Sequence, residues 1–427
     1  TIFGGEVMAV PKLRFKEFYV YWAKKKISEQ FNFHNTNSYS RALLAEQGEI
    51  MNIHYGDIHT KFSMLFDVKE EAVPFLSSEI DTNKIAENQF LQVGDLVIAD
   101  ASEDYKDIGK AIEVINLDNK KVVAGLHTYI ARPAERCAIG FNGYLMQTFE
   151  VREQIKKLAT GISVLGISKT NLGKVELKIP CLAEQTKIAS FLSNVDEKIS
   201  QLTQKHALLS QYKQGMMQKL FSQQLRFKAD DGSEFGEWEI TSIKDAVSFI
   251  KDGTHGTHQD DPSSNLFLLS AKNLQNGKIV IDDKDRKINQ KEFDSIYKNY
   301  KLQDGDILLS VVGTIGRVAI FKDYYESYAF QRSVAFMRFK KALTEFIYQL
   351  FLAKDFQNEL LVRQVVSAQP GIYLGDLSKI DIKLPCLEEQ TKIANFLSAI
   401  DQKIEVVAQQ IQQAKTWKKG LLQQMFV

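Results

Sequence analysis

The residues of this chain that could most readily do chemistry are two histidines in a glycine-rich segment. His255 and His258 occur in the run GTHGTH, and two aspartates follow at positions 260–261. Histidine and carboxylate side chains are zinc ligands, but a zinc site needs three or four of them held rigidly. This segment is a glycine-rich loop with no cysteine or third histidine nearby, so we expect hydrogen bonding within the loop. The same interpretation applies to His54 and His59 in HYGDIHTK.

Motifs that would mark a catalytic site are missing. The sequence has no G-x-x-x-x-G-K-[ST] loop for nucleotide phosphates, no G-x-G-x-x-G after a strand, no [ND]-P-P-Y methyltransferase signature and no G-x-S-x-G elbow. The run GTIG at 313–316 is too short for a phosphate loop, and we expect a hairpin turn there. The sequence therefore favours a binding protein over an enzyme.

The cysteines do not change this interpretation. Cys137, Cys181 and Cys386 are too few for a disulfide framework. Cys181 and Cys386 each follow a proline in matching segments, and we interpret them as small apolar residues where a helix begins.

Composition indicates a globular protein of two or more domains. The 427 residues are 44% hydrophobic and 25% charged, with a net charge of +1. Such a balanced charge does not by itself indicate a nucleic-acid partner, so any DNA contact must come from local basic patches. No stretch of 18 apolar residues occurs, and the first residues lack a signal-peptide layout. We expect a cytoplasmic protein with no membrane contact.

An internal repeat dominates the sequence. Residues 174–221 reappear as residues 379–426, and about 22 of the 48 positions are identical. KVELKIPCLAEQTKIASFLSNVDEKI becomes KIDIKLPCLEEQTKIANFLSAIDQKI. The chain therefore holds two equivalent units, and its function is something done twice.

Each copy of the repeat predicts one long helix. Its seam residues recur at alternating intervals of four and three positions, the spacing of a coiled coil. In the first copy these are Ile188, Leu192, Val195, Ile199, Leu202, His206, Leu209, Lys213, Met216 and Leu220. In the second they are Ile393, Leu397, Ile400, Ile404, Val407, Ile411, Ala414, Lys418, Leu421 and Met425. Roughly 40 residues make a helix about 60 Å long, and matching seams should pack together.

The order of the segments predicts antiparallel helices. The first helix ends where LRF at 225–227 echoes LRF at 13–15, and the second helix ends at the C-terminus. If a pseudo-two-fold axis relates the repeats, the second helix runs back toward the first unit, and the chain end lies near the chain start. Lys213 and Lys418 could fix the register at some cost in stability, or extend their amino groups to solvent.

The segments between the helices also echo each other. LQVGDLVIADAS at 91–102 parallels LQDGDILLSVVG at 302–313, and GISVLGISK at 161–169 parallels GIYLGDLSK at 371–379. Apolar runs predict strands at 307–309 and 318–321, and a helical pattern covers 344–366. Such a mixture indicates α/β domains.

The predicted fold is thus a pair of α/β (α+β) domains joined by two long antiparallel coiled-coil helices in a circular pseudo-two-fold arrangement. The segments are an N-terminal stretch 1–12, a first domain 13–180, a central helix 181–224, a second domain 225–385 and a C-terminal helix 386–427.

The repeated motif P-C-L-[AE]-E-Q-T-K-I-A-x-F-L-S-x-[VI]-D-x-K-I resembles the specificity subunit of type I restriction–modification systems. The resemblance covers nearly the whole chain from about Pro11. Family-like segments in the second domain are 251–279, 305–321 and 330–339. Those in the first domain are 51–62, 94–114 and 125–133, which look like a different recognition-domain subtype without the GTHG run.

The resemblance implies a function. Each domain would read one half of a bipartite, asymmetric sequence in double-stranded DNA. The helices would fix the separation of the half-sites and dock two modification subunits. Those subunits would carry S-adenosylmethionine and methylate adenine, while two restriction subunits, where the system has them, would use ATP and Mg²⁺. This chain would hold no cofactor and would not be an enzyme.

Candidate DNA contacts follow from the loops and the family-like segments. In the second domain, glycines that allow close backbone approach accompany Lys251, Thr254, His255, Thr257 and His258. The family-like segments add Lys272, Asn273, Arg317, Gln331, Arg332 and Gln369. In the first domain we favour Tyr55, His59, Thr60, Lys61, Ser102, Lys106 and His127. Arg, Gln and Asn are best suited to read bases, because they can form two hydrogen bonds with guanine or adenine. A solvated surface role is the alternative for each residue.

Equivalent positions on the two helices predict contacts with partners. The pairs are Gly215 with Gly420, Phe191 with Phe396, Tyr212 with Trp417, and Phe221 with Phe426. Close approach of a partner helix would explain the glycines, and tolerance near a fraying helix end is the alternative. The aromatic residues lie off the seam and would dock onto recognition domains or onto modification subunits.

Three alternative functions make different predictions from the one that the resemblance implies. A coiled-coil adaptor would show no sequence-selective DNA retention even with its partners. A stand-alone DNA-binding regulator would bind tightly by itself. A fused methyltransferase would need catalytic motifs that this chain lacks.

Overall fold

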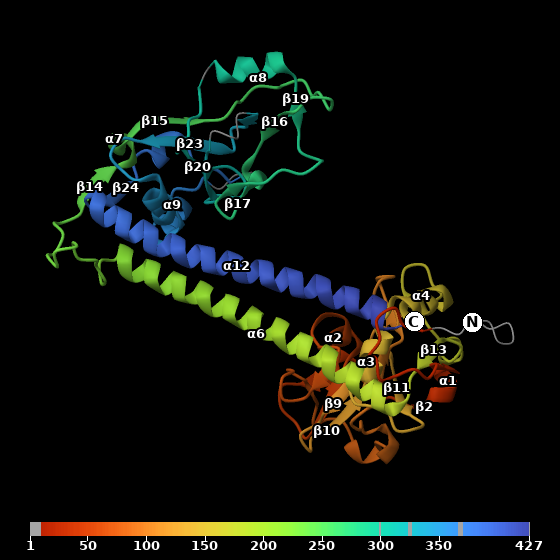
Figure 1. Ribbon diagram of the computed structural model, residues 1–427. Helices are drawn as coiled ribbons and strands as arrows, with labels where there is room; N and C mark the ends of the chain where they lie inside the picture. Colours follow the sequence, from red (N-terminus) through yellow and green to blue (C-terminus); the bar gives the residue numbers. More distant parts are fainter. Residues whose placement is uncertain (1–9, 299, 323–326, 366–369, 427) are drawn as a thin grey trace. The chain divides into compact units, whose positions relative to one another are not determined.

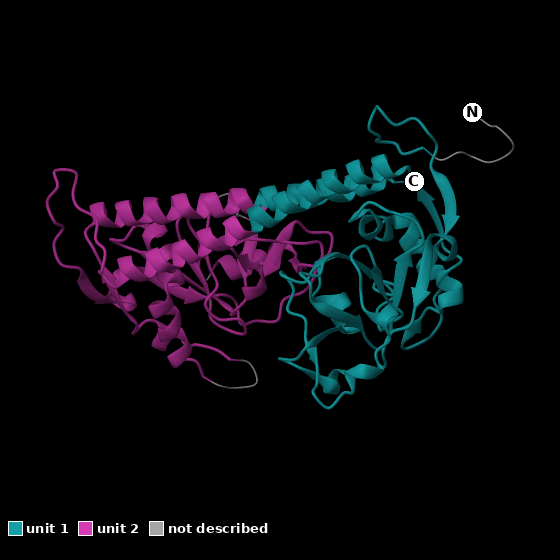
Figure 2. Cartoon of the chain, turned by 90° about the horizontal axis from the view of Figure 1, so that it is seen from below, with its two compact units in different colours: residues 1–203, 409–427 teal, residues 204–408 magenta. Residues whose placement is uncertain are grey.

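The computed structural model describes residues 10–298, 300–322, 327–365 and 370–426. The chain divides into two compact units (Figure 2). Unit 1 comprises residues 1–203 and 409–427, and unit 2 comprises residues 204–408. Each unit holds one globular domain and half of each long helix.

The two long helices are α6 (Leu182–Phe221) and α12 (Leu387–Met425), close to the predicted ranges. In unit 1 the first half of α6 lies beside the last half of α12, where Phe191 and Trp417 meet with ring centroids 6.0 Å apart. In unit 2 the last half of α6 lies beside the first half of α12, where Lys213 contacts Asp401. The helices are therefore antiparallel in both units, as predicted (Figure 1).

The predicted seam is largely buried. Among the described residues, the buried seam positions of α6 are Ile188, Leu192, Val195, Leu202 and Leu220, and those of α12 are Ile393, Leu397, Ile400, Val407, Leu421 and Met425. The acidic residues at the start of each helix, Glu184 and Glu389, are also buried, and each pairs with an arginine. The helix pair is thus held both by its apolar seam and by the domains at its ends.

The first globular domain contains a mixed five-stranded sheet in the order β2-β11-β7-β9-β5. Its strands are β2 (Phe31–His34), β11 (Thr128–Pro133), β7 (Leu96–Ala99), β9 (Ala111–Asn116) and β5 (Leu65–Asp67). All pairs are antiparallel except β5 with β9. A second sheet joins β10 (Lys121–Ala124), β4 (Ile50–Ile53), β6 (Phe75–Leu76) and β3 (Leu44–Ala45).

Strand β7 shows why this segment reads as a continuous apolar run. Leu96 and Ile98 face a core shared with α6 and α12, whereas Val97 and Ala99 face a second core on the other side of the sheet. A strand whose neighbouring residues alternate between two cores must be apolar throughout. Helices α3 (Phe141–Met146) and α4 (Phe149–Leu158) complete the first core.

The second globular domain is built around an antiparallel four-stranded sheet, β15-β23-β20-β21. Its strands are β15 (Val247–Asp252), β23 (Val334–Phe339), β20 (Ile307–Ser310) and β21 (Val318–Ile320). Strand β20 is the counterpart of β7: Ile307 and Leu309 face the core next to the helices, and Leu308 faces the outer core. The predicted correspondence between 91–102 and 302–313 is therefore confirmed.

Smaller elements complete the second domain. They are the sheet β19 (Lys287–Ile288), β16 (Leu266–Leu269) and β22 (Tyr328–Phe330), the hairpin β17 (Leu274–Gln275) and β18 (Lys278–Ile279), and helices α8 (Gln290–Tyr297), α9 (Thr344–Leu352) and α10 (Lys354–Val362). The predicted helix 344–366 is thus two helices, because Ala353 between them is extended with ψ 144°.

Equivalent two-stranded ribbons lead into the long helices. β1 (Ala23–Lys26) pairs with β13 (Glu176–Ile179), and β14 (Glu239–Ser242) pairs with β24 (Asp381–Leu384). The remaining short elements of the first domain are α1 (Ile27–Gln30), α2 (Tyr55–Thr60), β8 (Ala101–Ser102), β12 (Leu165–Gly166) and α5 (Lys169–Leu172), with 3₁₀ turns at 41–43, 82–84 and 87–89. Those of the second domain are α7 (Ile243–Ala246), α11 (Leu374–Leu377) and a 3₁₀ turn at 271–273.

The last described residues of the chain lie beside the first described ones, as predicted. The Leu13 amide donates to the Gln424 carbonyl at 2.8 Å, and in unit 2 the Leu225 amide donates to the Lys219 carbonyl at 3.1 Å. The second contact joins residues only six positions apart. The contact between distant parts of the sequence in unit 1 is therefore equivalent to a contact within one continuous segment in unit 2. None of the described helices combines the length and apolar character needed to span a membrane.

Candidate nucleic-acid interface

The loop that follows β15, residues 253–261, carries the histidines of the second domain, and we call it the GTHG loop. It begins in close contact with a neighbouring strand end: a Cβ on Gly253 would lie 2.1 Å from the Phe330 carbonyl oxygen. Thr254 then donates its amide to Phe330 and accepts one from Arg332, at 2.9 and 3.0 Å. The structure therefore brings Thr254, Gln331 and Arg332 together, and glycine at 253 is required for this approach.

His258 secures the GTHG loop from inside. Its Nδ1 lies 2.6 Å from a Glu292 carboxylate oxygen on α8, and its Nε2 lies 2.7 Å from the Thr254 hydroxyl. The His258 side chain is 9% exposed. It therefore positions the loop, which confirms the expectation of hydrogen bonding, and we no longer assign it a base contact.

The outer side of the GTHG loop presents polar groups to solvent. The His255 ring is mostly exposed and lies 2.7 Å from the Asp252 carboxylate. Lys251, Thr257 and Arg332 are exposed, and Gln331 is partly exposed. These side chains form the accessible part of the candidate interface in this domain.

A second group lies around the turn at 271–273. The exposed Lys272 pairs with Asp285 at 2.7 Å, and the Arg317 guanidinium donates to the Lys272 carbonyl at 3.2 Å. Asn273 is 2% exposed. Its side-chain oxygen accepts from the Ser270 amide, and its side-chain nitrogen donates to the Val280 carbonyl. We therefore correct the assignment of Asn273, which closes a turn. Gln369 lies outside the described residues.

In the first domain, an aromatic cluster forms where α2 meets the turn before β11. The Tyr55 ring lies 6.0 Å from the His59 ring and 5.4 Å from the His127 ring. His127 has a left-handed backbone, φ 58°, and its ring contacts Asp100 at 3.2 Å. Residues predicted from separate segments of the sequence thus share one surface.

Other predicted residues of the first domain hold this surface in place. His59 contacts the Ala101 carbonyl at 3.0 Å, which fixes α2 to β8. The Thr60 hydroxyl donates within α2, and Lys61 pairs with Asp57 at 3.1 Å. The Ser102 side chain is buried and donates to the Asp104 carbonyl, so it is a turn residue and not a base contact. Lys106 is exposed nearby in the same loop.

Arg41 is a residue that the sequence analysis missed. Its guanidinium lies 3.2 Å from His54 Nδ1 and 3.0 Å from Asp57, and half of the side chain is exposed. His54 caps α2 by accepting the Gly56 amide, and burial, followed by the charge of Arg41, lowers the His54 pKa. Arg41 stands outside every family-like segment, so no motif indicated it.

The aromatic residues assigned to partners mostly pack within their own unit. Phe191 contacts Phe15, Phe396 contacts Phe227, Phe221 contacts Phe346, and Phe426 contacts Trp22 and Phe141. Phe221 and Phe426 are less than a tenth exposed. We therefore reassign these two to the cores that join the domains to the helices, the first of our two alternatives.

The remaining positions on the long helices stay open. Tyr212 is 52% exposed, and Trp417 is 54% exposed. A Cβ placed on Gly215 or Gly420 would meet no atom within 4 Å, so no described part of this chain approaches them closely. A role for these four residues with a partner stays a prediction.

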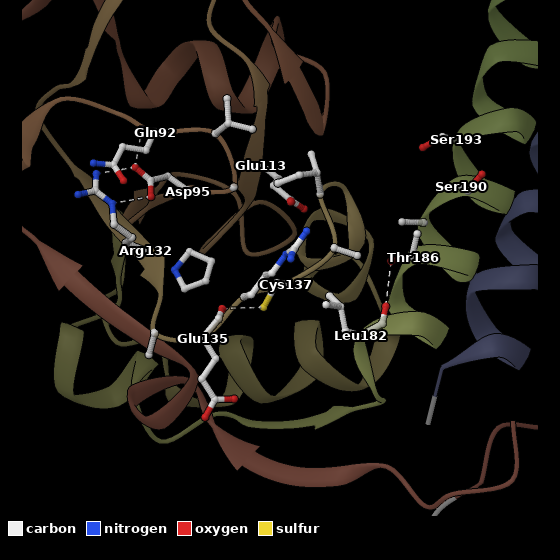
Figure 3. A pocket seen from close by; sticks show the side chains of 18 residues that line it. Gln92, Asp95, Glu113, Arg132, Glu135, Cys137, Leu182, Thr186, Ser190 and Ser193 are labelled. Carbon is white, nitrogen blue, oxygen red and sulfur yellow. Dashed lines mark hydrogen bonds and ion pairs between the residues drawn. The ribbon is translucent and has the colours of Figure 1, made fainter.

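A cavity of about 740 Å³ lies in unit 1 between the sheet and the start of α6 (Figure 3). Its lining includes Glu113, which accepts the Gly140 and Gly143 amides at 2.7 and 2.6 Å. Burial raises the pKa of Glu113 to about 7 against the effect of these hydrogen bonds. None of the candidate DNA contacts within the described residues lines this cavity.

Metal ligation has no candidate in the described part of the chain. Across residues 10–298, 300–322, 327–365 and 370–426, no group of three or more His, Cys, Asp or Glu residues is arranged to hold a metal ion. The His255 and His258 rings turn to carboxylates instead.

A known protein family matches both halves of the chain. The sequence model described as "Type I restriction modification DNA specificity domain" matches residues 19–211 and 236–416. Each match covers one globular domain and most of the long helix that follows it.

Two relatives illustrate the similarity. The type I restriction enzyme MjaVIII specificity subunit of Methanocaldococcus jannaschii is 28% identical over 291 residues, which span 65% of this chain and 68% of that protein. The type I restriction enzyme EcoKI specificity subunit of Escherichia coli K12 is 22% identical over 362 residues, which span 81% of this chain and 75% of that protein.

Solved structures share the fold. The S subunit of a type I restriction–modification system from M. genitalium matches with a TM-score of 0.56 and 14% identity, over 98% of this chain and 99% of that one. A chain from a structure described as showing complex assembly and conformational transition of the type I R-M system matches with a TM-score of 0.57 and 14% identity, over 95% and 97%. Since the family model matches most of this sequence, and does so twice, the chain belongs to the family of type I restriction–modification DNA specificity domains.

Proposed function

We propose that this chain is the sequence-specific DNA-binding subunit of a type I restriction–modification complex, in which each globular domain reads one half of a bipartite target. One observation carries the proposal: the two units repeat the same framework but carry different surface loops. Framework contacts recur at equivalent positions, as in the Arg14–Glu184 and Arg226–Glu389 pairs. The candidate surface loops differ, since unit 1 carries the Tyr55–His59–His127 cluster and unit 2 carries the GTHG loop. Equal frameworks with unequal loops suit an asymmetric target.

The two loop surfaces suit different parts of the recognition task. Exposed Lys and Arg side chains contact phosphates, and Arg, Gln and His side chains can read base edges in the major groove. With a net charge of +1, the chain binds through these local groups and not through its overall field. Binding should therefore weaken with salt only as steeply as a small number of phosphate contacts requires.

The same proposal assigns the chemistry to partners. Two modification subunits dock on the helices and methylate adenine with S-adenosylmethionine, and restriction subunits, where present, use ATP and Mg²⁺. The relatives' names support this assignment, since they are specificity subunits of restriction enzymes. This chain supplies the address, holds no cofactor and acts in the cytoplasm.

The test is to express the chain together with its modification subunit and map methylated adenines in the host genome. Methylation confined to one bipartite motif with a fixed spacer supports the proposal. A companion strain should carry a chain in which residues 253–261 are replaced by a glycine–serine loop. In this strain, methylation should no longer depend on the sequence of one half of the motif, because the second domain no longer reads that half.

Other results would contradict the proposal in distinct ways. Scattered or absent methylation with an assembled complex would indicate a coiled-coil adaptor. Tight sequence-selective binding by the purified chain without modification subunits would indicate a stand-alone regulator.

A further inference from the structure

The junction between each domain and the helix pair contains a repeated ion pair. Lys213 Nζ on α6 lies 2.6 and 2.8 Å from the two carboxylate oxygens of Asp401 on α12. In the other unit, Lys418 on α12 lies 2.5 Å from Asp196 on α6. The two pairs are equivalent, since Asp196 and Asp401, and likewise Lys213 and Lys418, are 205 positions apart.

A side chain from the globular domain joins each pair. The Tyr144 hydroxyl on α3 donates to Asp196 at 2.8 Å, and the Gln349 amide on α9 donates to Asp401 at 2.7 Å. Tyr144 and Gln349 are also 205 positions apart, and both are almost completely buried. Each aspartate therefore links three parts of its unit: the helix that carries it, the opposite helix and the globular domain.

Both lysines occupy positions of the apolar seam. The Lys213 side chain is 12% exposed, and that of Lys418 is 23% exposed. A partly buried lysine in a coiled-coil seam reduces stability unless its charge is compensated, and such residues select one register over others. Here the compensation comes from an aspartate beside the seam of the other helix.

The seam alone does not exclude a shift by one heptad. An apolar pattern with a period of seven looks the same after one helix moves by seven residues along the other. After such a shift Lys213 would face Ala394 or Ala408 in place of Asp401, and Lys418 would face Ala189 or Thr203 in place of Asp196. Every one-heptad alternative thus leaves both ammonium groups without a carboxylate.

We propose that the Asp196–Lys418 and Lys213–Asp401 pairs, anchored by Tyr144 and Gln349, set the register of the helices and thereby the single half-site spacing that the subunit accepts. This inference rests on the proposed function. A shift of one heptad moves a domain by about 10 Å, or about 3 base pairs of DNA. The four charged residues determine specificity for spacing, while the loop residues determine specificity for sequence.

The test uses the full chain with its modification subunit and a plasmid library that carries the two half-sites at every spacing around the natural one. The broken variant is D196K/D401K, which places lysine against lysine in both units. The restored variant is D196K/D401K/K213D/K418D, in which each pair is reversed. Gln349 can accommodate the reversal, because its buried Oε1 has no hydrogen-bond partner and can accept from a lysine. The Tyr144 hydroxyl oxygen can accept in the same way.

The matched control is E405K, which makes the same charge reversal one turn beyond Asp401. Glu405 pairs with Lys278, but both side chains are more than half exposed, so the pair contributes little. The wild type and E405K should methylate one spacing. In the broken variant, the preference for that spacing over its neighbours should fall about tenfold, and the restored variant should recover it.

Each outcome decides the matter. A single spacing retained by the broken variant overturns the proposal, and so does a restored variant that accepts as many spacings as the broken one. If circular dichroism shows that the broken variant does not fold, D196N/D401N is judged by the same criterion. Failure of the wild-type complex to methylate any member of the library would instead refute the proposed function.

Discussion

At the scale of single residues, Arg332 is the side chain best placed to read a base. It is exposed beside the GTHG loop, and its backbone amide is fixed to Thr254. We expect Arg332→Ala to weaken specific binding by about 1–3 kcal/mol and to relax sequence preference at one position, because arginine pairs with guanine through two hydrogen bonds. The measurement is a competition titration against DNA altered at single positions.

A phosphate contact would behave differently. It would lower affinity for all sequences about equally and reduce the salt dependence. Lys383→Ala on β24 is the matched control, since it removes an exposed cation outside the candidate interface. Unchanged affinity and unchanged preference in Arg332→Ala would remove Arg332 from the interface.

Glu113 gives a prediction about pH. Burial raises its pKa to about 7 in the folded chain, against an ordinary value of 4.5. The folded state therefore binds a proton more tightly than the unfolded state between these values, and the resulting stabilisation is complete below pH 4.5 and disappears as pH rises through 7. Glu113→Gln lacks this dependence. Relative to the wild type, its stability should increase by up to about 3 kcal/mol between pH 4.5 and pH 8.

Urea unfolding at a series of pH values tests this difference. Glu17→Gln in the same unit is the control with the opposite sign. A hydrogen bond from Lys187 lowers the Glu17 pKa, so the stabilisation from Glu17 is present above the ordinary value and is lost as pH falls. Parallel pH profiles for Glu113→Gln and the wild type would contradict the pKa of Glu113.

The sequence predicted residues at this scale unevenly. It indicated Lys213 and Lys418, because a charge in an apolar seam is visible in the pattern, but it gave no partner for them. The partners Asp196 and Asp401 lie beside the seam, and their environment depends on Tyr144 and Gln349 from distant segments. His258, Asn273 and Ser102 were assigned to DNA because polarity in a loop does not reveal burial.

At the scale of elements, the length of the helix pair is the quantity to change. We expect that inserting one heptad after Thr203 in α6 and after Ala408 in α12, where the units divide, keeps both half-sites and lengthens the accepted spacer by about 3 base pairs. Both insertions are needed because each ion pair must keep its partner. Methylation of the spacing library measures the result.

A heptad inserted between Asp230 and Asp231 is the control. This exposed turn lies between α6 and β14 and carries no seam residue, so the spacing should not change. An unchanged spacer length after the paired helix insertions would refute the idea that the helices fix the separation of the half-sites.

The long helices were predictable to within a few residues, because the heptad pattern and its repetition are local signals. The sheets were not, since β11 pairs with β2 and β7 across large stretches of sequence. The predicted helix 344–366 failed for a tertiary reason. The chain turns at Ala353, which lets the rings of Phe351 and Phe356 stack at 4.0 Å in the core.

At the scale of the whole molecule, the contact between the chain start and the chain end has a direct test. We expect a circular permutant to fold and to keep its target, if Phe426 is joined to Lys12 by a short linker and new ends are opened between Gln223 and Gln224. The Leu13–Gln424 contact is equivalent to the Leu225–Lys219 contact, which lies within one continuous segment. The permutation makes the first segment continuous and opens the second. Thermal unfolding and methylation mapping measure the result.

A permutant opened between Ile98 and Ala99 is the control. Its new ends interrupt β7, whose residues belong to two cores, so it should lose the fold of unit 1. Equal tolerance of both permutants would indicate that the junction has no special standing.

The equivalence of the two ion pairs also bears on the ancestry of the gene. Asp401 and Lys418 both belong to α12, so a half-length protein with one domain and this single helix carries both partners of the pair. Two identical copies that pack about a two-fold axis, with these helices antiparallel, would form the pair twice and would recognise a palindromic DNA sequence. Duplication and fusion of such an ancestor would then allow each half to diverge, and the palindromic target would become two half-sites of different sequence.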